Sequence, residues 1–190
     1  WYFENNPSEN RTDYDCNRDG FLDGVMLIYG YPDYSSLRNY NYGNLWAYCY
    51  WRGNTGGMIT KPVANPFFWA SYDFMYSSSS APSHTGTSQR MGDGDTSHCS
   101  IDAHTYIHEM GHMFGLDDYY DYSNSYSPAG GFSMQDNNVG GHDPFSSLSL
   151  GWGKAYIPTE TTTITLKPFA TTGEMILLSP EWNTFNSAFD

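Results

Sequence analysis

The sequence predicts an α+β fold with a mixed sheet, because apolar runs of strand length come first and helix signals come later. The 190 residues are enough for one domain with a hydrophobic core. Three runs are predicted strands, the first of them buried: "GVMLIYGY" at 24–31, "LWAYCYWRG" at 45–53 and "FFWASYDFMY" at 67–76. The polar segment 77–99 is predicted to be a long loop at the rim of a cleft.

The main helix is predicted in "SIDAHTYIHEMGHMFG", residues 100–115. Ser100 or Asp102 suits its N-cap, because a side-chain oxygen there accepts a hydrogen bond from the first helical turn. Gly115 suits its C-terminal end, where a residue in the left-handed conformation is common.

A second, shorter helix is predicted in "HDPFSSLSLGWG". Asp143 suits the N-cap and Pro144 the first helical position, while Gly151 ends the segment. Phe145 and Leu148 are expected on one face of this helix.

The C-terminal part is predicted to form a short β hairpin, in which "ATTG" joins the strands "TTTITLKPF" (161–169) and "EMILLSP" (174–180). We therefore expect residues 1–157 to form the main domain. Residues 158–190 are expected to be a β-rich segment that begins a further β region.

Composition limits the partners of the chain. With 21 acidic and 8 basic side chains its formal net charge is −13, which argues against binding to nucleic acid or to anionic membranes. No apolar run reaches transmembrane length, so membrane insertion is not expected. The polar opening "WYFENNPSEN" has no basic start and predicts no signal peptide. The 17 tyrosines and the few Lys and Arg residues are typical of an extracellular domain.

The three cysteines do not indicate a catalytic or metal-binding role. Cys16, Cys49 and Cys99 allow at most one internal disulfide and leave one thiol over. They do not form a CxxC pattern, so a cysteine-ligated zinc site is not expected.

The stretch "HEMGHMFGLDDYY" carries a metal motif. His108 and His112 are four residues apart and therefore lie on one face of a helix, where two imidazoles can bind one ion. Glu109 leaves the helix about 100° away and can reach a water molecule at that ion. This HExxH pattern is typical of catalytic zinc sites, which use three protein ligands and keep one position for water.

The third ligand is predicted from the residues after the second histidine. Gly115 ends the helix and lets the chain reverse, and Asp118 follows it by three residues, as in the HExxHxxGxx(H/D) motif of the metzincins. Asp117 is a rival ligand. Because it comes one residue before Asp118, its side chain is expected to point away from the metal. Other zinc peptidases take their third ligand from a glutamate on a later helix. The next Glu after the motif, Glu160, lies beside a predicted strand, so this alternative is disfavoured.

Two other residues near the motif have supporting roles in the prediction. His104 falls on the same helical face as His108, but three histidines on one straight helix cannot surround a metal tetrahedrally, so His104 is expected to support or pack. Met134 in "GGFSMQD" is predicted to form the Met-turn that metzincins place beneath the zinc, although any methionine can simply fill a core.

A calcium loop is predicted near the start. "DCNRDGFLD" places Asp15, Asn17 and Asp19 at alternate positions, followed by a glycine and Asp23, as in loops of EF-hand type. Met26 stands where an EF-hand has its bidentate glutamate, so the loop is not a full EF-hand. The alternative is an acidic turn before a strand.

With these motifs the chain resembles the immune inhibitor A family of secreted bacterial metallopeptidases. "DCNRDGFLDGVMLIYG", "HEMGHMFGLDDYYD", "GGFSMQD" and "DPFSSLSLGWGKA" come in that family's order, over residues 13–155. The resemblance implies a metzincin-like peptidase domain at 1–157 and an extracellular setting. The zinc ligands it implies are His108, His112 and Asp118, with Glu109 as the catalytic carboxylate. Members of that family usually contain further β domains, so a piece of a longer protein is expected.

The sequence therefore predicts a zinc-dependent endopeptidase that is secreted or held at the cell surface. Metal-activated water hydrolyses peptide bonds of a protein or peptide substrate, with Glu109 as the general base. The segment after Met134 is expected to line the S1′ pocket, and a monomer is expected. The candidate donors to the oxyanion are Tyr119, Tyr120, Tyr122 and His142. The alternative is a non-catalytic metal-binding adhesin or binding module on a peptidase fold, against which an intact Glu109 counts.

Overall fold

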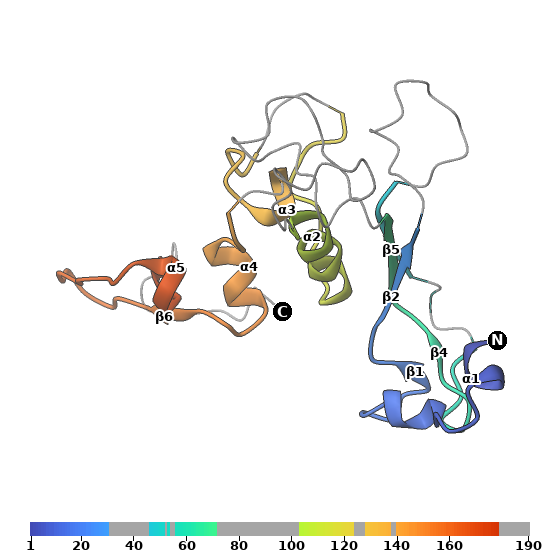
Figure 1. The fold of residues 1–190 in the computed structure, drawn as a ribbon. Helices are drawn as coiled ribbons and strands as arrows, with labels where there is room; N and C mark the ends of the chain where they lie inside the picture. Colours follow the sequence, from blue (N-terminus) through green and yellow to red (C-terminus); the bar gives the residue numbers. More distant parts are fainter. Residues whose placement is uncertain are drawn as a thin grey trace, which may run out of the picture. The chain divides into compact units, whose positions relative to one another are not determined.

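The computed structural model describes residues 1–30, 46–51, 53, 56–71, 103–123, 128–137 and 140–178. The chain forms two compact units, Trp1–Asp118 and Tyr119–Asp190 (Figure 1). The described part is α+β, with a mixed sheet and few helices, which confirms the fold class at that level. The domain boundary expected after residue 157 stays a prediction.

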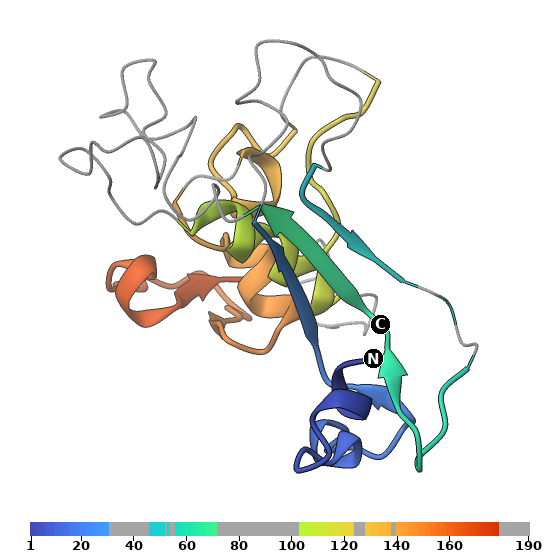
Figure 2. The ribbon, with the colours of Figure 1, turned by 45° about the vertical axis from the view of Figure 1, so that its right-hand side comes forward.

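The main sheet of the first unit has three strands among the described residues. β5 (Phe67–Ser71) lies in the centre, parallel to β2 (Val25–Tyr29) and antiparallel to β3 (Tyr48–Tyr50). Figure 2 shows these strands side by side. The three predicted strands are thereby confirmed. β2 and β3 are shorter than the described parts of their apolar runs, whereas β5 covers all of the described part of its run.

The sheet has a narrow extension toward the N-terminus. The chain begins with α1 (Tyr2–Asn5) and the 3-10 helix η1 (Arg11–Tyr14). β1 (Phe21–Leu22) then pairs in parallel with β4 (Val63–Ala64), just before β2 and β5 pair in the same direction. The same two chain segments therefore pair in parallel twice, first as β1 with β4 and then, after a short gap, as β2 with β5.

The core of the first unit lies between this sheet and the helix α2 (His104–Met113). Phe68 and Ala70 of β5 are fully buried, and Cys49 of β3 is nearly so. Tyr106 packs its ring against Phe68, with ring centroids 6.1 Å apart. Its hydroxyl donates to the carbonyl of Ser71 at 2.6 Å, so one side chain joins α2 to the end of β5.

The burial predicted for β2 is wrong. Met26, Leu27 and Ile28 are 40–49 % exposed. β2 lies at the edge of the described sheet, whereas α2 lies against β5 and β3. An apolar run fits an edge strand and a central strand equally well, so the pattern alone did not reveal which strand the helix would cover.

The main helix is shorter than predicted in the described part. It begins at His104, with Ala103 as an N-cap that makes no side-chain hydrogen bond. The predicted caps Ser100 and Asp102 lie outside the described residues, as does the predicted loop 77–99.

The second unit contains the helix predicted from its caps. α4 (Pro144–Ser149) has Asp143 as N-cap, which accepts from the backbone N–H of Ser146 at 2.9 Å. Gly151 follows the helix with φ +70°, as its predicted end requires. The buried side of α4 is polar, because Ser146 and Ser147 are buried while Phe145 is 54 % exposed.

The predicted C-terminal hairpin is wrong. β7 (Glu174–Ile176) pairs in parallel with β6 (Lys154–Tyr156), and residues 161–167 form no strand. The predicted turn is instead the end of the helix α5 (Phe169–Thr172), which Pro168 precedes. Proline has a φ suited to a helix start, and β-branched residues form a strand only where a partner edge is available.

Gly20 occupies a position that only glycine fits. Its φ is +88°, and an added Cβ would lie 2.7 Å from the backbone nitrogen of Met58. We expect Gly20→Ala to lower the free energy of unfolding by about 2 kcal/mol or more. Gly30→Ala is the matched control, because nothing lies within 4 Å of its added Cβ and no positive φ is recorded there. Urea unfolding measures both, and equal losses would contradict the assignment.

Candidate metal centre

Two histidines of α2 point to one place. His108 and His112 are 6 % and 8 % exposed, and their Nε2 atoms lie 3.0 Å apart. Their spacing of four residues puts them on one helical face, as the sequence predicts. Two ring nitrogens this close, both shielded from solvent, can act together only on a shared proton or a shared cation.

The helix ends in a Schellman motif directly after the second histidine. Gly115 has φ +92° and donates its N–H to the carbonyl of His112 at 2.9 Å. Leu116 donates to the carbonyl of Gly111 at 3.0 Å. These are the two hydrogen bonds of the motif, and the left-handed residue between them reverses the chain. The predicted helix stop at Gly115 is confirmed.

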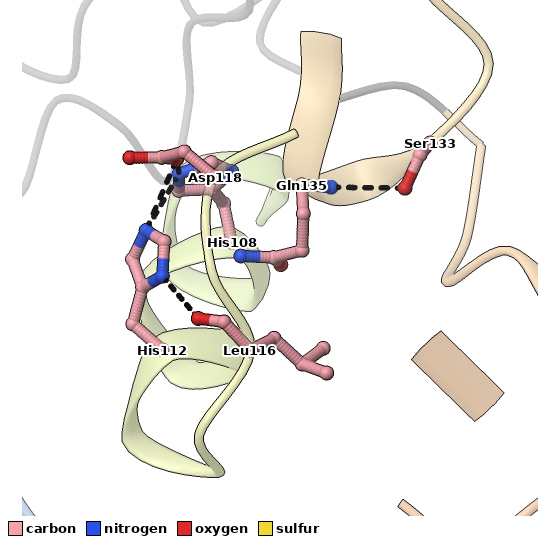
Figure 3. A network of polar contacts seen from close by, with 6 residues as sticks. All are labelled: His108, His112, Leu116, Asp118, Ser133 and Gln135. Carbon is pink, nitrogen blue, oxygen red and sulfur yellow. Dashed lines mark hydrogen bonds and ion pairs between the residues drawn. The ribbon is translucent and has the colours of Figure 1, made fainter. Parts of the chain in front are cut away.

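The reversed chain holds the ring of His112. The carbonyl of Leu116 lies 2.7 Å from Nδ1 of His112, and the buried Leu116 side chain fixes this segment (Figure 3). A carbonyl can only accept, so Nδ1 carries the proton and Nε2 keeps its lone pair when the ring is neutral. This is the arrangement that orients a metal-binding histidine.

Asp118 completes the group. Its Oδ1 lies 3.0 Å from Nε2 of His108 and 3.2 Å from Nε2 of His112 (Figure 3). We call these three residues the His–His–Asp cluster. It is the one group of three or more His, Cys, Asp or Glu side chains in the described part of the chain whose ligand atoms lie near enough to one another to hold a metal ion.

The donor set fits a tetrahedral cation. Two ligands bound at about 2.0–2.1 Å with tetrahedral angles lie roughly 3.3–3.4 Å apart. The edges of the cluster are 3.0–3.2 Å, slightly shorter than this separation. Imidazole nitrogen and carboxylate oxygen are both zinc ligands, and three of them leave a position open.

The electrostatics of the cluster favour a positive charge. Burial lowers the pKa of His112, but the hydrogen bonds to Asp118 and to the Leu116 carbonyl outweigh it, so the pKa is raised. The lone pairs of three close ligand atoms repel one another unless a proton or a cation lies between them. The raised pKa of His112 has the same cause, because a bound proton relieves this repulsion as a metal ion would.

Glu109 lies beside the cluster without belonging to it. Its side chain is buried, and burial raises its pKa to about 7, which His108 and His112 partly oppose. Its carboxylate accepts a hydrogen bond from the backbone N–H of Cys49 in β3. Burial and the nearby Glu109 together raise the pKa of the Cys49 thiol to about 12.

The structure separates the two adjacent aspartates. Asp118 reaches both histidines, whereas Asp117 is exposed and outside the cluster. His104, at the first position of α2, is half-buried and also outside the cluster. Both placements match the sequence predictions for these residues.

Several predicted residues lie in the second unit. Met134 begins α3 (Met134–Asn137) and is buried, and its place beneath a metal stays a prediction. Tyr120 packs against Tyr122, and His142 lies 5.8 Å from Trp152 between ring centroids, at a pocket of about 720 Å³. Which group faces an oxyanion, and whether the segment after Met134 lines S1′, also stay predictions.

The acidic loop is folded onto its own backbone. Asp15, Asp19 and Asp23 each accept hydrogen bonds from backbone N–H groups, and the amide of Asn17 donates to Asp19 at 2.9 Å. Within the described residues their carboxylates are not among the groups close enough to hold a metal ion. The calcium site stays a prediction. Nearby, Cys16 is an exposed free thiol.

Sequence reasoning missed three contributions to the site. The Leu116 carbonyl and the Cys49 N–H are backbone groups, so no residue type in the sequence indicates them. The third is the ring of Trp51, just after β3, whose centroid lies 6.3 Å from that of His112. The sequence held one indication of the Leu116 contact. An apolar residue directly follows the glycine that ends the helix, and the Schellman motif often buries such a residue.

Comparisons of the chain with protein-family models, with curated proteins and with solved structures found no match. Among the described helices, none is long and apolar enough to cross a membrane.

We expect Asp118→Ala to weaken zinc binding by at least about 100-fold, more than the loss of a supporting group does. Asp118→His should restore much of the affinity, because imidazole is also a zinc ligand. Asp117→Ala is the matched control and should bind zinc like the unchanged protein. Competition with a chromophoric chelator measures all three. Loss of zinc from Asp117→Ala, with Asp118→Ala unaffected, would reverse the assignment.

Calcium is expected to raise the melting temperature through the acidic loop, because a ligand that binds only the folded state stabilises it by mass action. Asp19→Asn should abolish the increase, whereas Asp13→Asn, a nearby exposed residue, should keep it. Melting curves in calcium and in EGTA that superimpose for the unchanged protein would contradict the site.

Proposed function

We propose that the chain is a secreted zinc endopeptidase of the metzincin type, which acts on protein or peptide substrates. The observation that carries the proposal is the His–His–Asp cluster with a buried carboxylate next to it. His108, His112 and Asp118 would hold the ion through atoms that lie 3.0–3.2 Å apart. A bound zinc ion supplies Lewis acidity, which polarises a carbonyl and acidifies water.

Glu109 is the proposed general base. It is the next residue after a ligand, yet its side chain leaves α2 in a different direction and is not one of the ligand atoms. The Cys49 N–H fixes the carboxylate from the side of β3. From this position Glu109 takes a proton from the attacking water and later gives it to the leaving amine.

β3 offers a way to bind the main chain of a substrate. It is an edge strand among the described residues, paired with β5 on one side. An extended peptide that pairs with an edge strand is bound through its backbone, largely independently of its sequence. Trp51 directly follows β3 and its ring lies beside His112, so a peptide on this edge runs toward the cluster. This supports a peptide as the substrate.

The second candidate is a non-catalytic metal-binding adhesin or binding module. Such a protein needs the three ligands but has no use for a buried carboxylate beside them. Burying an acid without a role is unfavourable, because desolvation penalises its charged form. The burial of Glu109 therefore favours the enzyme over the binding module.

We expect Glu109→Gln to lower proteolysis of casein by about 100-fold or more, since general-base catalysis contributes about 10²–10⁴. Zinc content should stay near that of the unchanged protein, because Glu109 is not a ligand. Glu4→Gln, at an exposed residue of α1, is the matched control. Chelation should stop cleavage by the unchanged protein and added zinc should restore it.

Two outcomes would contradict the peptidase. The first is casein cleavage by Glu109→Gln at the rate of the unchanged protein. The second is a zinc-loaded, folded protein that cleaves neither casein nor a peptide library, which would favour the binding module.

A further inference from the structure

Trp51 lies on the face of the main sheet that α2 covers. Side chains of a strand alternate between the two faces, and Ala47 and Cys49 are buried in the core between the sheet and α2. Trp51 comes two positions after Cys49, and its ring packs edge-on against that of His112 in α2, with centroids 6.3 Å apart. All of these residues belong to the unit Trp1–Asp118.

The end of β3 therefore contacts two groups of the proposed site. The backbone N–H of Cys49 donates to the carboxylate of Glu109, and the ring of Trp51 packs against His112. Two positions along a strand span roughly 7 Å, about the length of two residues of an extended peptide. A peptide bond that reacts beside Glu109 thus lies within about two substrate residues of Trp51.

The indole of Trp51 is only half covered. Its side chain is 48 % exposed, so the part that does not contact His112 is open to a partner. A peptide that pairs with an edge strand is bound through its backbone, and its side chains determine specificity. Residues directly opposite one another on paired strands place their side chains on the same face. A substrate residue opposite Trp51 therefore places its side chain against the open indole.

The chemistry of this contact favours an apolar side chain. An aromatic or large aliphatic group covers the indole and removes apolar area of both partners from water. A serine covers little of the ring. A basic side chain would lie next to the imidazole that is proposed to hold a dication, and like charges repel.

We propose that Trp51 is a specificity-determining residue, which makes the site select peptides with an aromatic or large aliphatic side chain within about two residues of the cleaved bond. The inference rests on the proposed function, because it needs a peptide held beside the metal site. It goes beyond that function by naming the class of peptide and the residue that selects it.

The first test is digestion of a peptide library by the zinc-loaded full chain, with mass spectrometry to identify the residues around each cut. At one position near the cut, aromatic and large aliphatic residues should be enriched about 10-fold over serine. Trp51→Ala should abolish this enrichment and leave the other positions unchanged. Trp51→Phe should keep most of it, because a ring remains. A purely structural role would slow all cuts by one factor and leave the enrichment unchanged.

Trp46→Ala is the matched control. Trp46 is 54 % exposed and alternates with the buried Ala47, so it is expected on the opposite face of the sheet. Its enrichment should equal that of the unchanged protein. Zinc content is measured in every variant, and cuts are compared at full zinc occupancy. If Trp51→Ala fails to fold, Trp51→Gln, which keeps a long side chain without a ring, takes its place.

The second test measures binding without turnover, in zinc-loaded Glu109→Gln. Fluorescence anisotropy compares a labelled serine-rich peptide that carries one phenylalanine with the same peptide carrying serine instead. The phenylalanine peptide should bind about 10-fold more tightly. Adding Trp51→Ala to this protein should remove the difference.

The outcomes separate the two proposals. An apolar preference that persists in Trp51→Ala, or no such preference in the unchanged protein, overturns the role of Trp51 alone if cleavage is present. A chain that binds peptides with a preference dependent on Trp51 but cleaves none refutes the proposed function alone. Peptides that are neither bound nor cleaved overturn both.

Discussion

The end of α2 at Gly115 is the constraint on which the rest of the site depends. Without a left-handed residue there, the chain would not reverse, and neither the Leu116 carbonyl nor Asp118 would reach the histidines. Glycine adopts this conformation without the steric penalty that other residues incur. The left-handed conformation of Gly115 thus fixes both the orientation of His112 and the placement of Asp118 beside the two histidines.

The cluster brings together groups that are unfavourable in a folded chain on their own. Three buried ligand atoms within 3.2 Å of one another repel, and Glu109 adds a further buried carboxylate nearby. Replacing buried charged groups by a hydrophobic core of the same volume is often neutral or stabilising. Unfavourable local chemistry of this kind is expected where a site serves function rather than folding, and a bound cation would relieve the repulsion.

Sequence reasoning succeeded where local rules determine the structure. The spacing of His108 and His112, the glycine stop and the capped helix α4 all follow from geometry within a few residues. It failed where distant partners decide. β2 lies at an edge that the apolar run could not reveal, and β7 pairs with β6 rather than with the nearby segment 161–169. Strand pairing depends on which edges are available, and no short window of sequence contains that information.

The same distinction explains why Asp118 could be predicted but the contacts around the site could not. The number of residues after Gly115 determines which aspartate arrives at the histidines, so counting along the chain is sufficient. The group that holds the Glu109 carboxylate is the backbone N–H of Cys49 in the distant strand β3, and no residue type indicates a backbone N–H. A metal ligand is thus specified locally, whereas part of the support around the site comes from packing that only the fold provides. Rigid placement matters because a ligand that is already ordered loses little entropy when the ion binds.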